Sequence, residues 1–277
     1  MDPGSSPGVT DRGVDLGSSL GLSVFFHSFI HNKVMAEYDN DYLQWKAWDD
    51  QAFCVLTTEQ ARYFEAELGC SGALHLTQGA RVLEIGFGQG CFLTFAQSRQ
   101  WQVTGTEVNP HLVSMGQARG LDVHGAHDLS AWPDESFDLA VAFDVLEYVP
   151  QAEALGFLRD VMRVLKPGAR AVLRFPNGDS PFGLVHQNAD VTHVNAIGRG
   201  KLLFWAQALQ ADVLTLRGQA QPVFGVGPVL AFYRLAVWPV RKLLNLFVRV
   251  FFLGGAPIDF SASNVVAVLR KPGVDCE

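Results

Sequence analysis

The chain has 277 residues, of which 48% are apolar, and it carries a formal net charge of −7. This length suffices for one large domain with a substantial core and does not suggest two equal domains. The acidic balance argues against a general nucleic-acid binder, because such proteins gain much of their affinity by neutralising phosphates with Lys and Arg. The four cysteines form no CxxC pair, so neither a zinc knuckle nor a disulfide framework is indicated, and the cytoplasm is the expected compartment.

Residues 1–34 differ in composition from the rest of the chain. They begin with the Gly-, Ser- and Pro-rich stretch "MDPGSSPGVTDRG" and pass into "LGLSVFFHSFI", an apolar run that is too short to span a bilayer. The upstream part carries acidic residues where a signal peptide would have a basic region. We predict that residues 1–34 are a disordered leader or precede the true translation start, and that the ordered domain covers residues 35–277.

From about residue 57 onward, helix-like and strand-like stretches alternate. The stretch "TTEQARYFEAEL" predicts a capped helix, and the expected strands are "RVLEI", "VTGTEV", "LDVHGA", "FDLAVAF", "ARAVLRFP" and, near the end, "SNVVAVLRKP". The clearest helix between strands is "EALGFLRDVMRVLK", which is expected to stop at Pro167-Gly168. This alternation predicts a doubly wound α/β fold with a mostly parallel sheet, in which ligands bind at the carboxyl ends of the strands.

Three glycines follow the first of these strands in the stretch "VLEIGFGQGCF": Gly86, Gly88 and Gly90. Glycine tolerates positive φ and lets backbone N–H groups approach a bulky ligand, so such a loop can cradle a phosphate or lie under a nucleoside. A dinucleotide fingerprint requires G-x-G-x-x-G, but the position three after Gly88 is Cys91. The spacing therefore weakens the interpretation as an NAD site without excluding it.

The stretch resembles the first motif of class I S-adenosylmethionine-dependent methyltransferases, E-x-G-x-G-x-G, with Glu84 as the acid. Four further motifs follow in the family's order, and the resemblance covers about residues 57–177. It implies a seven-stranded Rossmann-like sheet and S-adenosyl-L-methionine as cofactor. It implies that Glu107 binds the ribose hydroxyls, and that Asp128 accepts a hydrogen bond from the adenine amino group while Leu129 covers the ring. The implied cofactor-binding set is Glu84, Gly86, Gly88, Gly90, Glu107, Asp128, Leu129 and Asp144, although Glu84 could instead bond loop amides.

Two places could supply a base for a hydroxyl acceptor. The first is "DVLEYV" after the fourth strand, with Asp144, Glu147 and Tyr148, where many relatives carry histidine in place of Tyr148. The second is the lid-like segment 178–205, which contains His186, Asp190 and His193. It resembles the "D-x-T-H" segment of methyltransferases that accompany bacterial surface-polysaccharide genes, where a helix and then a strand follow.

A histidine oriented by a carboxylate is a competent base near neutral pH. The trio His186, Asp190 and His193 does not have a strong metal-ligand spacing, and we predict no metal site. The remaining alternative is that these histidines only contact backbone in a lid.

Two other stretches could contact ligands or partners. The aromatic residues before the first helix, which could close over the cofactor or pack in the core, are Tyr38, Tyr42, Trp45 and Trp48. The segment 228–254 predicts an amphipathic helix with a cationic stripe beside a broad apolar face. Its charges and Pro239 argue against a membrane span. We expect it to lie on an anionic membrane surface, which would make the protein peripheral at the inner membrane face, or to pack internally or against a second subunit.

These observations predict a methyltransferase that acts on a hydroxyl of a sugar or lipid-linked glycan in polysaccharide biosynthesis. The alternatives are a small-molecule O- or N-methyltransferase with a quinone-like or amino acceptor, and a module that binds the cofactor without turnover. An NAD-dependent oxidoreductase is the alternative from outside this class.

Overall fold

The computed structural model describes residues 50–125 and 129–273. The predicted leader at 1–34, the aromatic residues Tyr38, Tyr42, Trp45 and Trp48, and the predicted adenine ligand Asp128 lie outside the described residues. The unit formed by the chain from Asp50 onward is described below.

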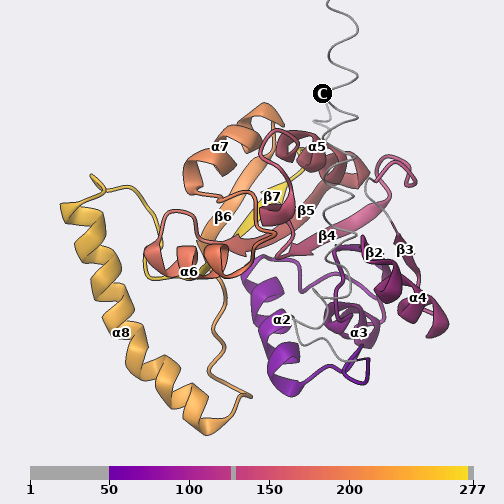
Figure 1. Cartoon of the computed structure of the whole chain (residues 1–277), viewed down its shortest axis with the longest axis horizontal. Coiled ribbons are helices and arrows are strands. Elements are labelled where there is room, and N and C mark those ends of the chain that lie inside the picture. The colour runs from indigo at the N-terminus through magenta and orange to yellow at the C-terminus, as the bar shows by residue number, and fades with distance from the viewer. Residues whose placement is uncertain (1–49, 126–128, 274–277) are drawn as a thin grey trace, which may run out of the picture. The chain divides into compact units, whose positions relative to one another are not determined.

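A seven-stranded sheet forms the centre of this unit (Figure 1). Its strands are β1 (Arg81–Ile85), β2 (Gln102–Glu107), β3 (Val123–Gly125), β4 (Phe137–Phe143), β5 (Leu165–Pro176), β6 (Asp212–Gly218) and β7 (Asn264–Arg270). They lie in the order β3-β2-β1-β4-β5-β7-β6. The pairs from β3 to β5 are parallel, and β7 is antiparallel to both of its neighbours. The predicted doubly wound, mostly parallel fold is confirmed.

Helices cover both faces of the sheet, as a parallel sheet requires (Figure 1). They are α2 (Thr58–Cys70), α3 (Cys91–Ser98), α4 (Pro110–Ala118), α5 (Ala154–Val164), α6 (Pro181–Ala189), α7 (Arg199–Ala208) and α8 (Pro228–Phe251), with a short 3-10 helix, η1 (Leu146–Tyr148). In the view of Figure 1, α5 and α7 lie above the sheet and α2 and α3 below it. The strands β1 and β4 are buried over nearly their whole length, which explains their continuous apolar sequence.

The helix α5 shows how an amphipathic pattern builds the core. Its buried residues recur three or four positions apart and include Leu158, Val161 and Met162. Each fully buried side chain of this kind contributes about 1.5–3 kcal/mol relative to an exposed one. The helix ends at Val164, earlier than the predicted stop at Pro167-Gly168, because Leu165 already pairs with Phe137 of β4.

After β5 the chain forms the helices α6 and α7 and then β6, the last strand at this edge of the sheet. An isolated bridge between Asn177 and Ile197 returns the chain toward the end of β5, and the helix and strand expected after the D-x-T-H segment are α7 and β6. The long helix α8 then follows. No helix of the described residues is long and apolar enough to cross a membrane.

Candidate functional site

The glycine loop leaves β1 and enters α3 through three residues with positive φ. The φ angles are 69° at Gly86, 48° at Gly88 and 70° at Gly90, a region that side chains with a Cβ rarely adopt. Space is restricted as well: a Cβ on Gly86 would lie 2.7 Å from Val145 Cγ2, and one on Gly90 would lie 2.6 Å from Cys54 Sγ. The loop therefore depends on glycine, as predicted, and Gly86 places it against the segment that leaves β4.

Glu107 ends β2 beside this loop. Its Oε2 accepts a hydrogen bond from the Gly88 N–H at 3.0 Å, and its Oε1 accepts from the N–H groups of Val108 and Asn109 at 2.8 and 3.1 Å. The side chain is buried. Three backbone donors thus hold the carboxylate in one position at the carboxyl end of the sheet, where a ribose is expected.

Glu84 lies within β1 and is only 4% exposed. Burial raises the pKa of its carboxyl group well above the usual value, the charge of Glu107 raises it further, and a hydrogen bond from the Leu93 backbone acts in the opposite direction. Its Oε2 has no hydrogen-bond partner within the described part of the chain. The contact with Leu93 supports the alternative that Glu84 bonds an amide at the start of α3, and the second oxygen is available to a donor.

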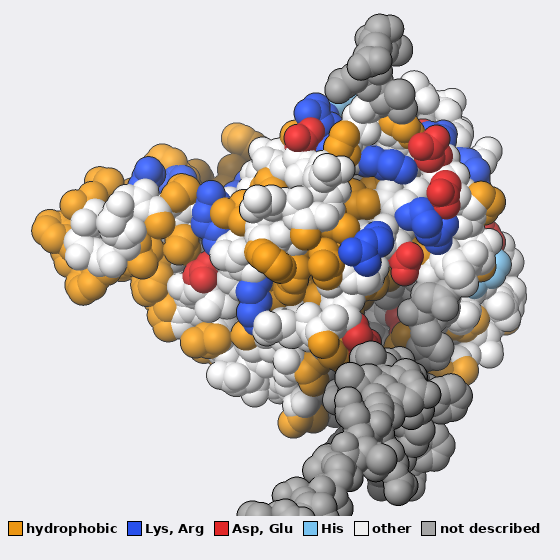
Figure 2. Space-filling view, turned by 90° about the horizontal axis from the view of Figure 1, so that it is seen from above, with side chains coloured by type: hydrophobic (Ala, Val, Ile, Leu, Met, Phe, Trp, Pro, Cys, Tyr) orange, Lys and Arg blue, Asp and Glu red, His pale blue; other side chains and the backbone are white. Residues whose placement is uncertain are grey.

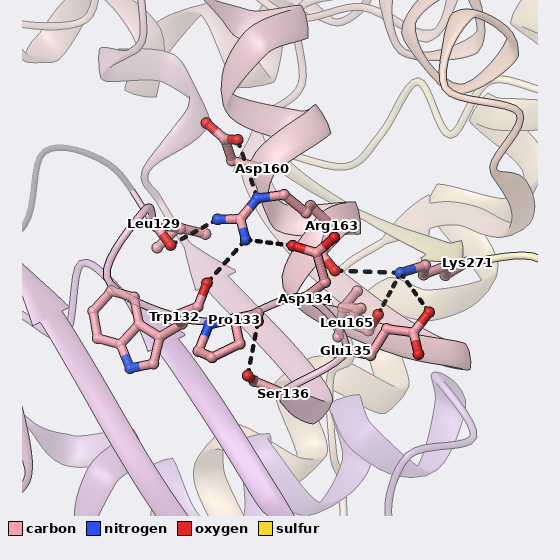
Figure 3. A network of polar contacts seen from close by, with 10 residues as sticks. All are labelled: Leu129, Trp132, Pro133, Asp134, Glu135, Ser136, Asp160, Arg163, Leu165 and Lys271. Atoms are coloured by element: carbon pink, nitrogen blue, oxygen red, sulfur yellow. Dashed lines mark hydrogen bonds and ion pairs between the residues drawn. The ribbon is translucent and has the colours of Figure 1, made fainter.

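Leu129, the predicted adenine contact, is held by the network in Figure 3. Arg163 Nη2 donates to the Leu129 carbonyl at 2.8 Å, while Arg163 Nη1 donates to the Trp132 carbonyl and pairs with Asp134, both at 2.9 Å. The Leu129 side chain is buried in the hydrophobic core. The loop before β4 is therefore fixed to the end of α5, and the contact between Leu129 and adenine stays a prediction.

Asp144 follows β4 with φ of 58°. Its Oδ1 accepts from Arg174 Nε at 2.8 Å, and its Oδ2 pairs with Arg174 Nη2. The guanidinium lies 5.3 Å from the ring centroid of Tyr63 and 5.2 Å from that of Phe143. Burial raises the pKa of Tyr63 to about 12, against the lowering effect of the Arg174 charge. Arg174 thus fixes Asp144 at the edge of the sheet, where its role toward the cofactor stays a prediction.

The two places that the sequence offered for a base meet in one cluster. Tyr148, at the end of η1, donates from its hydroxyl to Asp190 Oδ2 at 3.1 Å. The N–H groups of Val194 and Asn195 both donate to the Glu147 carbonyl, at 2.9 and 3.0 Å. The D-x-T-H segment therefore folds back onto the exit of β4, although 42 positions separate Tyr148 from Asp190.

His193 lies at the centre of this cluster, and its side chain is only 8% exposed. Its Nε2 is 3.6 Å from Asp190 Oδ2 and 4.0 Å from Glu147 Oε1. The imidazole packs edge-on against the Tyr148 ring, with the ring centroids 4.6 Å apart. We call Glu147, Tyr148, Asp190 and His193 the base cluster.

The remaining candidate base lies apart from this arrangement. His186 is exposed on α6, so its surroundings do not provide the two carboxylates that flank His193. Thr192 had not been singled out from the sequence, yet its N–H and hydroxyl both donate to Asp190 Oδ1, at 2.9 and 2.6 Å. The Asp-x-Thr spacing was the signal that could have revealed this turn. The described residues contain no group of three or more His, Cys, Asp or Glu that could hold a metal ion.

Comparison with known proteins supports a methyltransferase domain and its fold. Residues 83–173 match the family model described as "Methyltransferase domain". A solved S-adenosylmethionine-dependent methyltransferase from Archaeoglobus fulgidus superposes with a TM-score of 0.55 at 18% identity, over 76% of this chain and 94% of that one. One from Mesorhizobium loti gives 0.52 at 18% identity, over 74% and 98% of the two chains. The fold is that of a class I S-adenosylmethionine-dependent methyltransferase.

The curated relatives match a smaller share of this chain than the solved structures do. The "Ubiquinone biosynthesis O-methyltransferase" of Xanthomonas oryzae pv. oryzae strain PXO99A is 34% identical over 103 residues, which cover 34% of this chain and 42% of that protein. An "Uncharacterized methyltransferase" of Mycobacterium sp. strain JLS is 33% identical over 115 residues, covering 40% and 45%. The match thus spans less than half the length of these relatives.

The residues present fit the cofactor of a methyltransferase domain. The glycine loop leaves a backbone surface on which side chains would collide with Val145 and Cys54, and the Glu107 carboxylate is fixed beside it. A carboxylate has two acceptor oxygens, which suit the paired hydroxyls of a ribose. The NAD alternative fits less well, because the antiparallel β7 between β5 and β6 departs from the dinucleotide-binding strand order.

Proposed function

We propose that this protein transfers a methyl group from S-adenosyl-L-methionine to a hydroxyl, with His193 as the base. The observation that carries the proposal is the position of the base cluster directly after the segment that touches the glycine loop. Gly86 abuts Val145, and Val145 precedes the 3-10 helix that carries Glu147 and Tyr148. A cofactor bound on the loop and an acceptor beside His193 would then be neighbours, as an in-line displacement requires.

The bound cofactor would supply a methyl group activated by its positive sulfonium. Glu107 and the glycine loop would orient the nucleoside, and the buried cluster would exclude water. The imidazole of His193 would take the acceptor proton while the acceptor oxygen forms its bond to the methyl carbon, as the bond from that carbon to the sulfonium sulfur breaks and leaves a neutral thioether. The resulting imidazolium would be stabilised by Asp190 and Glu147, because opposite charges attract strongly where water is excluded. Asp190 is itself oriented by Tyr148 and Thr192.

For the acceptor, we propose a phenol-type hydroxyl on a quinone-like ring ahead of the sugar or glycan hydroxyl expected from the sequence. The name of the Xanthomonas relatives supports this order, whereas no relative described above carries a glycan or polysaccharide in its name. Physical chemistry supports it as well. An imidazole, with an ordinary pKa near 6.5, removes a proton more readily from a phenol, whose pKa is near 10, than from an alcohol, whose pKa is several units higher.

The other partner predictions stay proposals. The scattered cysteines favour the cytoplasm. A homodimer is tested below by light scattering.

A module that binds the cofactor without turnover is the second candidate function. The buried base cluster argues against that candidate, because a binding module has no use for a histidine flanked by two carboxylates.

The experiment combines binding with turnover in the full chain. S-adenosyl-L-methionine should raise the melting temperature while NAD does not, since only a ligand of the native state stabilises it. Transfer of a radiolabelled methyl group is then measured with three classes of acceptor: dihydroxybenzenes, free sugars and primary amines. We expect product with the dihydroxybenzenes. Stabilisation without transfer to any panel member would support the binding module, and stabilisation by NAD alone would overturn both candidates.

A further inference from the structure

The helix α8 is attached to the rest of the protein by its polar side chains. Arg234 donates to the Pro222 carbonyl and pairs with Glu59 at 3.2 Å. Asn245 donates to Asp259 Oδ1 at 2.6 Å and accepts from the Ser261 N–H at 2.7 Å. The predicted helix is thus present, but its stripe of polar residues faces largely inward. This arrangement is the reverse of that in an ordinary surface helix.

The opposite side of α8 is apolar and exposed. Phe232 is 74% exposed and Leu243 is 68% exposed. The outward apolar face consists of Val229, Phe232, Tyr233, Ala236, Pro239, Val240, Leu243, Leu246, Phe247, Val250 and Phe251. Figure 2 shows hydrophobic side chains gathered where α8 projects at the left of the view. Contiguous apolar surface on this scale marks an interaction site in a folded protein.

The charge of α8 differs from that of the chain as a whole. Residues 228–258 contain four cations, Arg234, Arg241, Lys242 and Arg249, and no acidic residue, although the whole chain carries −7. Lys242 and Arg249 are exposed, and their positions in the helix place them at the margin of the outward apolar face. A continuous apolar face bordered by exposed cations is complementary to an anionic lipid surface, which offers acyl chains and negative headgroups together.

We propose that the outward apolar face of α8 docks the protein on an anionic phospholipid membrane, with the helix lying in the plane of the interface. A second copy of the chain is a poorer partner, because pairing two such faces would bring rows of cations together with no acid on either helix. The inward polar contacts leave the helix free to present its apolar side while the sheet and the site stay in water. This inference does not depend on the proposed function, and its test needs neither cofactor nor acceptor.

Vesicle flotation with the full chain tests the proposal. Phosphatidylcholine vesicles with about 30% phosphatidylglycerol should carry the protein upward, and pure phosphatidylcholine vesicles should carry much less. Raising the salt from about 0.1 M to 1 M should weaken the binding, since exposed charges are then screened. A wild-type chain that stays unbound with the anionic vesicles would overturn the proposal.

Variants locate the binding on α8. Phe232→Glu combined with Leu243→Glu should reduce vesicle binding by about tenfold or more, because two charges would enter the apolar face. Lys242→Gln and Arg249→Gln should each reduce it about fivefold. The matched control is Phe204→Glu, which charges an aromatic residue that is 65% exposed on α7. Equal loss in the control and the α8 variant would contradict the assignment to this face.

Trp238, which is 61% exposed on α8, gives a local signal. Brominated lipids should quench the fluorescence of wild type more than that of Trp238→Phe, since bromine quenches only at close range.

Light scattering tests whether a second copy of the chain covers the outward apolar face instead. A wild-type dimer that the Phe232→Glu, Leu243→Glu variant converts to monomer, together with no quenching, would assign the face to a second copy and overturn the membrane proposal.

Discussion

The proposed cofactor site, formed by the glycine loop and Glu107, and the base cluster are assembled in different ways. The glycine loop and Glu107 come from adjacent strands, and the hydrogen bond that joins them spans only 19 positions. The base cluster joins the exit of β4 to a segment that follows β5, across 42 positions. The first holds its key carboxylate with three backbone donors, whereas the second combines backbone donors with the hydroxyls of Tyr148 and Thr192. Because the two sites are made of different residues, we expect substitutions to disable cofactor binding and proton transfer separately.

The largest effect is expected on turnover, from a substitution of His193 in the base cluster. His193→Ala should lower turnover by about a hundredfold or more, the usual contribution of a general base, and should leave the affinity for S-adenosyl-L-methionine near that of wild type. The rate of wild type should also rise with pH as the imidazole loses its proton, because only the neutral ring can act as a base. Steady-state kinetics and calorimetry measure the two quantities.

Substitutions of two other histidines serve as controls for His193→Ala. His75→Ala changes an exposed residue before β1, at the opposite end of the strands, and should behave as wild type. His186→Ala should also retain turnover because His186 is exposed on α6. If His186→Ala loses activity while His193→Ala keeps it, the base has been assigned to the wrong histidine. A loss of cofactor affinity in His193→Ala would show that the two regions are not separable.

Glu107→Ala should change the affinity for the cofactor. This variant should weaken S-adenosyl-L-methionine binding by about 1–3 kcal/mol, because the ribose hydroxyls would lose a charged partner. Calorimetry measures the affinity, and turnover at saturating cofactor should fall far less. Glu153→Ala, at an exposed acidic residue before α5, is the control. Unchanged affinity in Glu107→Ala would remove this carboxylate from the site.

An intermediate effect is expected at Asp190, which orients His193 without reacting. Asp190→Asn keeps the size of the side chain but removes its charge, so both the support for an imidazolium and the hydrogen bond from Tyr148 would change. Turnover should fall about tenfold, or ~1.4 kcal/mol, and the pH profile should shift because the imidazole loses a neighbouring negative charge. A loss as large as that of His193→Ala would mean that Asp190 is itself indispensable to proton transfer.

The same contrast explains how much of the molecule could be predicted from the sequence. The glycine positions and Glu107 were predictable because positive φ and strand ends are properties of a few adjacent residues. The convergence of Tyr148 with Asp190 was not, since it depends on where the segment after β5 folds. Helices show the same limit. The patterns of α5 and α8 are both amphipathic, but α5 buries its apolar side and α8 anchors its polar side.

The smallest effect is expected from a substitution of Glu84, which could serve either the fold or cofactor binding. In the folded protein its pKa is raised by burial and by Glu107, so folding favours the protonated form. The stability from burying that form is present below the unfolded pKa, near 4.5, and is lost as the pH rises through the folded value. Glu84→Gln cannot ionise and should keep that stability. Its melting temperature should exceed that of wild type at pH 8 and converge with it near pH 4.5.

The difference in melting temperature between Glu84→Gln and wild type should grow as the pH rises above 4.5. Differential scanning calorimetry without cofactor measures it, and Glu153→Gln should show no such pH dependence. The same variant then decides what Glu84 bonds. If its carboxyl serves only the Leu93 amide, cofactor affinity should stay within about twofold of wild type, because a Gln oxygen still accepts that bond. If an ionised Glu84 oxygen accepts from the cofactor, affinity should fall while the protein becomes more stable, since the charge that burial disfavours would be the charge that binding uses.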